Sequence, residues 1–380
     1  MSGAIDVGMG KSARRVYGLD ELSIVSSRRT RDVSDVDTSW QIDAFGFEIP
    51  VIASPMDSVS SPTTAIAMGK LGGLGVVHLE GLWTRHDEPE AVLDDLAELR
   101  DDQVHAALVQ AYSAPVRPDL VRARIAELHA AGVTACGAVS PANAQSMLPD
   151  LLAAELDLLV IQGTIVSAEH VSQGETEPLN LKRFVRELEI PVIVGGCASY
   201  PAALHLMRTG AAGVLVGVGQ GQASSTPDVL GVGGGHATAI ADARSARMRH
   251  LDETGVYVHV IADGGMRTGG DIAKAIVCGA DAVMIGTPLA AAEEAPGRGY
   301  NWGMAATHRT LPRGGRVGVG TRGTLAEVLF GPATDHSGST NLIGALRKSM
   351  AVCGYASLKE FQKADVVLGA ARGTPRGERA

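Results

Sequence analysis

Two turns of small residues in the C-terminal half of the chain have the composition and spacing of a phosphate-binding site. The first, Asp263-Gly264-Gly265, directly follows the β-rich run Val258–Ala262. The second, Gly286-Thr287, follows the run Ala282–Ile285, and the intervening Gly270–Cys278 has the apolar spacing of a helix. Such turns let main-chain N–H groups approach a phosphate closely, and Asp263 at a strand end can accept two ribose hydroxyl hydrogens. The pattern therefore predicts a site for a nucleoside monophosphate.

Turns of this kind must be positioned by parallel strands that all end at one face. The chain contains eight short β-forming runs, and helix-like patterns separate most of them. The runs are Pro50–Ala53, Leu74–His78, Val133–Ala138, Leu158–Ile161, Val192–Val194, Val214–Val216, Val258–Ala262 and Ala282–Ile285. This alternation predicts an α/β fold, a (β/α)8 TIM barrel, whose phosphate site follows the last two strands at the C-terminal face.

The barrel is expected to span residues 50–368 as a single domain. Residues 1–49 are polar and are predicted to be an N-terminal extension that packs on the barrel, and residues 369–380 are predicted to be a disordered tail. A further apolar run, Val104–Val109, precedes the helix-like Pro118–Ala131. We interpret this pair as a short inserted strand and helix between the second and third strands.

Composition narrows the class of protein. The 380 residues carry a net charge of −9, which argues against nonspecific binding to nucleic acid or anionic lipid. No run of 18 apolar residues and no basic-then-apolar leader is present, so we expect a cytoplasmic protein. The four cysteines show neither CxxC spacing nor a Cys/His ligand pattern, so neither a disulfide framework nor a metal site is expected.

Five segments in register resemble the IMP dehydrogenase/GMP reductase family. They are Pro50–Val59, Gly72–His78, Val216–Gly221, Ile261–Gly265, and Ala282–Thr287 with the following Glu293–Gly297. In that family a paired regulatory (CBS) module normally lies between strands two and three. Only Trp83–Gly132 is available here, which is too short for the module. The chain is thus similar to the IMP dehydrogenase-related paralogues that lack the tandem CBS module.

The resemblance implies a nucleotide site and a dinucleotide site. The residues that match the family's substrate-binding positions are Ser54, Met56, Asp263, Gly264, Gly265, Gly286, Thr287, Tyr300, Gly303 and Met304. They are expected to hold IMP or a similar purine nucleotide monophosphate. The positions expected to meet NAD or NADP are Gln162, Gly196, Gly217, Gly219 and Gly221. The resemblance also implies a homotetramer. It further suggests a monovalent cation site at Gly219, Gly221 and Ser224.

The catalytic loop departs from the family pattern. Ser224 stands where the family has the cysteine that attacks the purine, with Ser225 and Thr226 beside it. A thiol is partly ionised near neutrality, whereas a serine hydroxyl needs an adjacent base. His236 is the candidate base, and Cys197 is a candidate substitute nucleophile.

Arg313 falls where the family has Glu or Gln contacting the purine, and the segment between Met304 and Pro312 is too short for the family's Arg-Tyr flap. Three functions stay open: an IMP dehydrogenase-related oxidoreductase of purine metabolism using NAD(P), a non-catalytic purine-nucleotide-binding regulatory protein, or an FMN-dependent barrel.

Several motifs also have purely structural interpretations. Asp263 could be the N-cap of the following helix, and His78 fits a hydrogen-bonded core histidine better than a catalytic one. Gly10-Lys11-Ser12 lacks the first glycine of a P-loop. Gly318–Gly323 matches GxGxxG without the acidic residue expected downstream, so we interpret it as a chance match.

Overall fold

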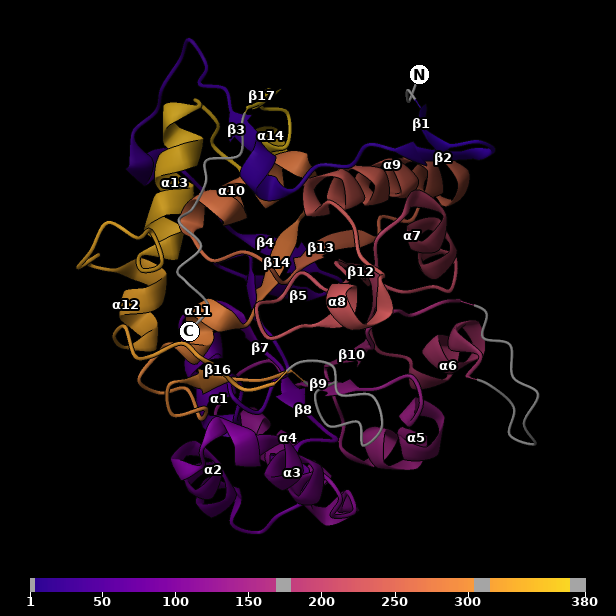
Figure 1. The fold of residues 1–380 in the computed structure, drawn as a ribbon, viewed down its shortest axis with the longest axis vertical. Coiled ribbons are helices and arrows are strands. Elements are labelled where there is room, and N and C mark those ends of the chain that lie inside the picture. Colours follow the sequence, from indigo (N-terminus) through magenta and orange to yellow (C-terminus); the bar gives the residue numbers. More distant parts are fainter. Residues whose placement is uncertain (1–3, 169–178, 304–314, 370–380) are drawn as a thin grey trace.

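The structure, a computed structural model, describes residues 4–168, 179–303 and 315–369, and a parallel barrel forms its centre (Figure 1). The strands are β6 (Val51–Ala53), β7 (Leu74–Gly75), β8 (Val77–His78), β9 (Cys136–Val139), β10 (Leu158–Gln162), β11 (Val192–Cys197), β12 (Gly213–Val216), β13 (His259–Asp263) and β14 (Ala282–Ile285). Their order is β7-β6-β14-β13-β12-β11-β10-β9-β8. Because only Val76 separates β7 from β8, the two ends of the sheet meet and the barrel closes.

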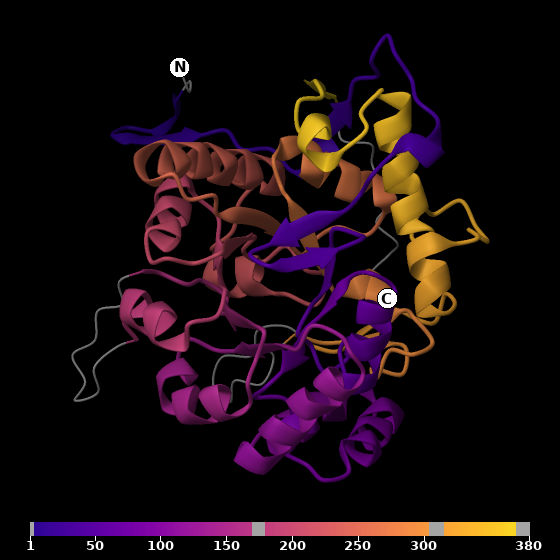
Figure 2. The ribbon, with the colours of Figure 1, turned by 180° about the vertical axis from the view of Figure 1, so that it is seen from behind.

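Helices surround this sheet in both front and back views (Figures 1 and 2), as the predicted (β/α)8 fold requires. The longer ones that follow barrel strands are α1 (Pro62–Lys70), α5 (Ala144–Ala153), α6 (Leu181–Leu188), α7 (Tyr200–Met207), α9 (His236–Thr254), α10 (Gly269–Cys278) and α13 (Leu342–Val352). Shorter ones are α8 (Thr226–Leu230), α11 (Thr287–Ala290), α12 (Leu325–Phe330) and α14 (Leu358–Phe361). Branched aliphatic residues fill the core, and Leu158–Ile161 of β10 are all buried because both faces of a parallel strand are covered.

The helix after β13 begins at a side-chain cap. Thr268 accepts a hydrogen bond from the amide of Asp271, whose carboxylate in turn accepts from the Thr268 amide. This capping box fixes where α10 begins and so where the preceding turn ends. The alternative in which Asp263 caps this helix is therefore wrong, and its carboxylate is free for another role.

The insertion after β8 is helical, and the strand expected at Val104–Val109 is wrong. It contains α2 (Pro89–Glu98), α3 (Asp101–Ala111) and the predicted helix, observed as α4 (Pro118–Ala130). Val104 and Leu108, one helical turn apart, are the buried residues of α3. They pack in a small satellite core with residues of α2 and with Trp302. A short apolar run is ambiguous between strand and helix, and here the i, i+4 spacing decided.

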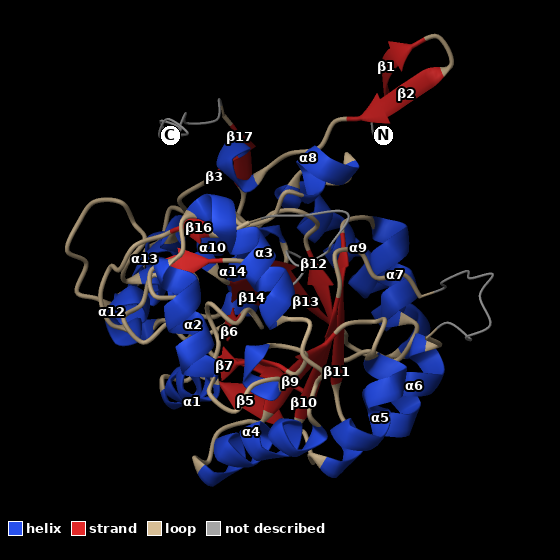
Figure 3. Ribbon diagram, turned by 60° about the horizontal axis from the view of Figure 1, so that its bottom comes forward, coloured by secondary structure: helices blue, strands red, loops and turns tan. Residues whose placement is uncertain are grey.

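The N-terminal extension contacts the barrel at the end where its strands begin, opposite the cavity mouth. We call this the closed end. The hairpin β4 (Trp40–Ile42) and β5 (Phe45–Phe47) buries Trp40, Ile42 and Phe47 there, with Trp40 edge-on to His259 at the start of β13. Strand β3 (Leu22–Ile24) pairs with β17 (Val366–Leu368) near the other end of the chain. The hairpin β1 (Ala4–Gly8) and β2 (Lys11–Arg14) projects from the body (Figure 3).

Both glycine motifs that were set aside lie outside the barrel strands. Gly10-Lys11-Ser12 forms the turn and first residues of the exposed β1–β2 hairpin, not a strand-to-helix loop. The run Gly318–Gly323 begins in β16 (Val317–Gly318), which pairs antiparallel with β15 (Tyr300–Asn301). Neither belongs to a βαβ unit, so neither has the context of a nucleotide-binding fingerprint. Within the described ranges, no helix combines the length and apolar character needed to cross a bilayer.

Candidate functional site

A cavity of about 440 Å³ opens at the C-terminal ends of the barrel strands, a size typical of small-molecule sites. Its floor is the barrel mouth, and loops after β6, β8, β9, β10, β12, β13 and β14 supply its walls. The predicted site residues that line it are Ser54, Met56, Gln162, Gly217, Gly219, Gly221, Ser224, Thr226, Asp263, Gly264, Gly265, Gly286, Thr287 and Gly303. The structure therefore brings together most of the positions that the sequence analysis selected.

The turn after β13 has the backbone conformation that its glycines allow. Gly264 and Gly265 have φ angles of +75° and +76°, in the left-handed region that residues with a Cβ rarely occupy. The Gly264 amide donates to the carbonyl oxygen of Met284 on β14, which joins the two turns. Two successive left-handed glycines turn the chain sharply beside Gly286-Thr287. This arrangement suits close approach of an anion to the main chain.

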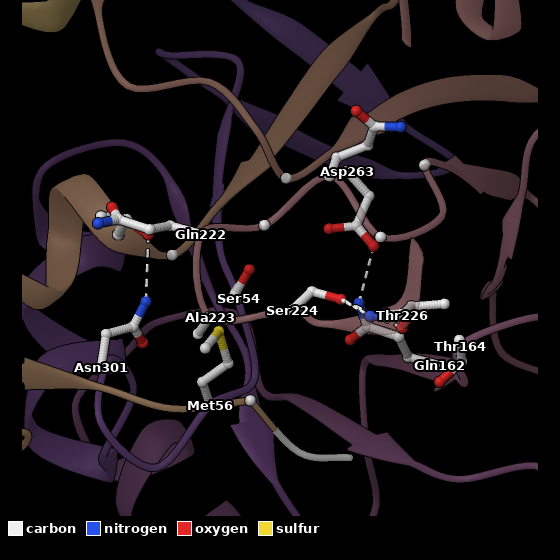
Figure 4. A pocket seen from close by; sticks show the side chains of 18 of the residues that line it. Ser54, Met56, Gln162, Thr164, Gln222, Ala223, Ser224, Thr226, Asp263 and Asn301 are labelled. Atoms are coloured by element: carbon white, nitrogen blue, oxygen red, sulfur yellow. Dashed lines mark hydrogen bonds between the residues drawn. The ribbon is translucent and has the colours of Figure 1, made fainter. Parts of the chain in front are cut away.

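Asp263 lies at the end of β13 with its carboxylate toward the cavity (Figure 4). Gln162 at the end of β10 donates from Nε2 to Asp263 Oδ2 over 2.9 Å. Burial raises the pKa of Asp263 to about 6, and the hydrogen bond from Gln162 opposes this rise. The Oε1 atom of Gln162 is buried without a partner among the described residues. Gln162 thus orients the carboxylate and keeps one acceptor of its own.

Thr287 is oriented by a residue that the sequence analysis missed. Asn301, only 1% exposed, donates from Nδ2 to Thr287 Oγ1 over 3.2 Å. Its Oδ1 accepts a hydrogen bond from the Ser58 hydroxyl over 2.9 Å. Because Asn301 occupies an acceptor position on Oγ1, the hydroxyl hydrogen of Thr287 stays available as a donor. This side chain lines the same cavity as the glycine turns.

The loop after β12 carries Ser224 without a base beside it. Its hydroxyl donates to Thr226 Oγ1 over 3.2 Å and accepts from the Thr226 amide over 3.3 Å, just before α8 (Figure 4). His236, the candidate base, instead contacts the carbonyl oxygen of Val216 through Nε2 over 2.9 Å. Burial lowers the pKa of His236 despite that contact. The geometry is that of a local cap, not of an activated nucleophile.

None of the four cysteines, all within the described residues, lines the cavity. Cys197, the candidate substitute nucleophile, is buried, and its Sγ lies 3.5 Å from the carbonyl oxygen of Leu215. Burial raises the pKa of this thiol to about 12, so the thiolate is scarce near neutral pH. Cys197 is therefore a structural residue of β11.

Two predicted contacts do not reach the cavity. The ring of Tyr300 faces the Arg316 guanidinium at 3.9 Å and packs on the satellite core, so it does not line the wall. Gly196 donates its amide to the carbonyl of Gly163 and is buried between strands. Both corrections arise because sequence position near a strand end does not fix which way a residue faces. Met304 and Arg313 lie outside the described residues.

A second wall of the cavity was not predicted. It is formed by His78, Glu80, Arg85, Tyr112 and Ser140, from the ends of β8 and β9 and from the insertion. His78 ends a predicted strand and Glu80 lies two residues beyond it, so their position at the barrel mouth was a usable signal. Tyr112 follows α3 and gave no such signal. Its place on the wall depends on how the insertion folds back over the barrel.

The fold and cavity define a class of protein, the (β/α)8 barrels with a small-molecule site at the C-terminal mouth and glycine turns after the last two strands. Residues 17–314 match the family model described as IMP dehydrogenase / GMP reductase domain. The chain therefore belongs to the IMP dehydrogenase/GMP reductase family, as its motifs predicted.

Its relatives include full-length matches. An uncharacterized oxidoreductase of Mycolicibacterium smegmatis is 53% identical over 374 residues, covering 96% of this chain and 100% of that protein. A crystal structure of an IMP dehydrogenase/GMP reductase-like protein from Corynebacterium glutamicum is 44% identical, with a TM-score of 0.91, and the match covers 96% and 98% of the two chains. Inosine-5'-monophosphate dehydrogenase of Methanocaldococcus jannaschii is 27% identical, with 92% of each chain covered.

Proposed function

We propose that this chain binds a purine nucleoside monophosphate, IMP or a close analogue, and acts on it as an NAD(P)-dependent oxidoreductase of purine nucleotide metabolism. The observation that carries the proposal is the single cavity that joins Asp263, both glycine turns and the Ser54–Met56 segment. These groups come from three neighbouring strands, β13, β14 and β6. One ligand with a diol, a phosphate and a flat base would engage all of them.

Each part of the nucleotide has a chemically matched partner. The ionised carboxylate of Asp263 accepts hydrogen bonds from the two ribose hydroxyls. The amides of the glycine turns and the Thr287 hydroxyl donate to the phosphate, as anion sites on glycine-rich turns do. Met56, partly buried beside the core, offers a polarisable thioether to the face of a purine. Ser54 contributes a hydroxyl on the same side of the cavity.

The residues present also fit a nicotinamide dinucleotide. The buried Gln162 Oε1 atom has no partner among the described residues, and a carboxamide N–H would satisfy it. Gly217, Gly219 and Gly221 line the cavity on the adjoining loop, and beside Gly221 the space that a side chain would occupy is open. When bound, NAD(P) supplies hydride transfer, which the side chains of the protein lack. The residues of the chain would bind and orient both ligands and exclude water.

The chemical step must proceed without a cysteine at the position of Ser224. A serine hydroxyl that is hydrogen-bonded to Thr226 lacks the nucleophilicity of a thiolate. We therefore expect turnover far slower than that of an enzyme with a thiolate nucleophile. The test is an absorbance assay at 340 nm, run with IMP and NAD and separately with GMP and NADPH. A rate that Asp263→Asn abolishes supports the proposal. No rate above background in either direction overturns its enzymatic half.

A second candidate is a non-catalytic nucleotide-binding protein that signals to a partner or another subunit. One observation favours it: the Ser224 hydroxyl is hydrogen-bonded to Thr226 and not to a base. A thermal-shift panel of purine monophosphates tests it, since a ligand at 100 times its dissociation constant adds about 2.7 kcal/mol. Stabilisation without turnover supports this function, and no shift with any nucleotide removes it. Absence of flavin colour in the purified protein removes the FMN alternative.

Two further expectations belong to this proposal. The family resemblance suggests a homotetramer, which light scattering on the purified chain tests directly. It also suggests a monovalent cation at the loop that carries Gly219, Gly221 and Ser224. Replacement of potassium by lithium in the thermal-shift buffer tests the cation site, because loss of a bound ion lowers the melting temperature.

A further inference from the structure

A buried base, His78, lines the cavity, and a buried acid, Asp57, lies behind it. His78, at the end of β8, is 4% exposed and lines the cavity, and Asp57 behind it is 1% exposed. The His78 Nδ1 atom lies 3.7 Å from Asp57 Oδ2. Among the described residues, Nδ1 of His78 and Oδ1 of Asp57 are both buried without hydrogen-bond partners. Two adjacent unsatisfied atoms of this kind are costly, and natural proteins rarely keep them without a use.

The other charged groups on this wall already have partners. Glu80 accepts hydrogen bonds from the Ser140 amide and hydroxyl and from Asn143 Nδ2. Arg85 donates from Nε to the carbonyl oxygen of Glu80 over 2.8 Å and from Nη1 to that of Ala114. Burial lowers the pKa of the Arg85 guanidinium, and the negative charge of the nearby Glu80 opposes this lowering.

Asp57 is held in place from the insertion. Its Oδ2 accepts hydrogen bonds from the Leu82 amide over 3.0 Å and from the Tyr112 hydroxyl. Trp302 donates from Nε1 to the same hydroxyl over 3.1 Å. The carboxylate is thus fixed by two donors at Oδ2, while its Oδ1 atom and the Nδ1 atom of His78 have no hydrogen-bond partner among the described residues. The insertion between the second and third barrel strands therefore completes this wall.

We propose that His78 and Asp57 form an acid–base pair that exchanges a proton with the ligand bound in the cavity. The pair rests on the proposed function, because it serves the same bound nucleotide. An O–H bond of a cavity water or ligand hydroxyl breaks, its oxygen keeps the electron pair, and the proton forms an N–H bond at His78 Nε2. The oxygen then takes a replacement proton from the solvent, so that binding draws a proton from the buffer. The charge gained by the imidazole is balanced by the carboxylate of Asp57, whose Oδ2 atom lies 3.7 Å from Nδ1. His78 touches the ligand, and Asp57 is a positioning residue.

The test measures protons that are taken up or released on binding, which is independent of turnover. IMP is titrated calorimetrically at pH 7 in two buffers of different ionisation enthalpy, and the protons exchanged per IMP bound are compared between variants. We expect the wild type to exchange a larger fraction of a proton per IMP bound than His78→Gln does. Asp57→Asn should lose at least half of this difference between the wild type and His78→Gln. Protons exchanged by the phosphate of IMP are common to all variants and cancel.

A second histidine gives a matched control. His259 Nδ1 lies 3.8 Å from Asp281 and is also buried without a partner among the described residues, but it is at the closed end of the barrel. His259→Gln should exchange protons as the wild type does. If His78→Gln does not fold, histidine NMR on the wild type replaces it, and one cavity-facing imidazole should shift with IMP.

The outcomes separate the two proposals. Equal proton exchange by wild type and His78→Gln, with IMP still bound, overturns the acid–base pair and leaves the proposed function standing. Failure of the wild type to bind IMP overturns both. Where turnover is measurable, His78→Gln should lower kcat by about 100-fold and leave KM within about threefold, because general acid–base groups contribute about 10²–10⁴ to rate.

Discussion

Asp263 meets opposite requirements in the ligand-free and ligand-bound protein. Its enclosure in the barrel mouth favours the neutral acid, and burial accordingly raises its pKa to about 6. Binding of a ribose diol favours the carboxylate, because only the ionised group accepts both hydroxyl hydrogens. The hydrogen bond from Gln162 to Oδ2 stabilises the carboxylate and so limits the rise in pKa. A pKa perturbed in this way is typical of residues whose position serves ligand binding at a cost in stability.

Ribonucleotide affinity should therefore depend on pH. We expect the affinity for IMP to rise between pH 5 and 7 with a midpoint near the Asp263 pKa of about 6, and to fall about tenfold per unit below it. Calorimetric titration across this range measures the effect. A 2',3'-dideoxy analogue keeps the phosphate but lacks the diol, so its affinity should lack this component. Identical pH profiles for the two ligands would contradict the assignment of Asp263.

The same residue should make the ligand-free protein less stable at higher pH. The folded pKa of about 6 lies above the ordinary value of 3.8, so between these values the folded state binds more protons than the unfolded state. The stability that protonation contributes is present below pH 4 and is lost as pH rises through 6, by roughly 3 kcal/mol. Asp263→Asn should accordingly raise the melting temperature at pH 8, as measured by differential scanning fluorimetry, and weaken IMP binding. A lower melting temperature would contradict this assignment.

Replacement of Ser224 tests the effect of the missing thiol. We expect Ser224→Cys to raise IMP-dependent NADH formation at least about tenfold, since a thiol is partly ionised near neutrality. Ser224→Ala, the matched control, should stay within about threefold of the wild type because the hydroxyl has no base beside it. Both rates come from the absorbance assay at 340 nm. A larger loss in Ser224→Ala would instead show that the hydroxyl itself acts.

At the scale of elements, the mouth of the barrel depends on close contact between strand ends. Gly217 follows β12, and a Cβ there would lie 2.1 Å from the carbonyl oxygen of Asp263 at the end of β13. Any side chain at this position must push the two strand ends apart. The loop that carries Ser224 and the strand that carries Asp263 are therefore positioned by the same contact.

Gly217→Ala should lower the free energy of unfolding by about 1–3 kcal/mol and weaken IMP binding at least about tenfold. Urea denaturation measures the first effect and calorimetry the second. Gly221→Ala in the same loop is the matched control, because a Cβ there meets no atom within 4 Å. Its unfolding should match that of the wild type. Equal destabilisation by both substitutions would show that the loop, not the strand contact, is sensitive.

At the scale of the whole molecule, a buried charge cluster joins the C-terminal segment to the closed end of the barrel. Asp281 pairs with Arg247 of α9 over 2.7 Å and with Lys359 of α14 over 2.6 Å. Tyr257 and Gln362 also donate to its carboxylate. Burial alone would raise the pKa of Asp281, but the two cations outweigh it and lower the pKa. The cluster thus connects four separate segments of the chain.

Asp281→Asn should lower the free energy of unfolding by about 3–5 kcal/mol at pH 7, because it leaves Arg247 buried without its anion. Since the folded pKa is lowered, the stability that Asp281 contributes is present above the ordinary value of 3.8 and is lost as pH falls through the folded value. The difference between wild type and variant should therefore shrink in acid, as followed by circular dichroism. Asp119→Asn, at an exposed position of α4, should behave as the wild type.

Much of this arrangement could be predicted from local patterns. The eight predicted runs account for all nine strands of the sheet, with β7 and β8 in one run, because parallel strands buried on both faces consist of continuous aliphatic runs. Asp263 and Thr287 were found because turns of small residues directly follow two such runs. The helix α3 was misassigned because a run of six residues is too short to separate the two periodicities. The i, i+4 pair Val104 and Leu108 stands out once its packing on α2 and Trp302 is known.

The sequence by itself determined the strand-forming runs, the helical segments between most of them and the two glycine turns, because local periodicity and turn residues encode each of these. Tertiary structure alone decided that Tyr112 reaches Asp57 and that Asn301 orients Thr287. It also placed Tyr300 away from the cavity. These partners come from different loops, and no local periodicity encodes the angle at which one loop folds over another. The residues that complete the cavity are therefore fixed by packing between elements.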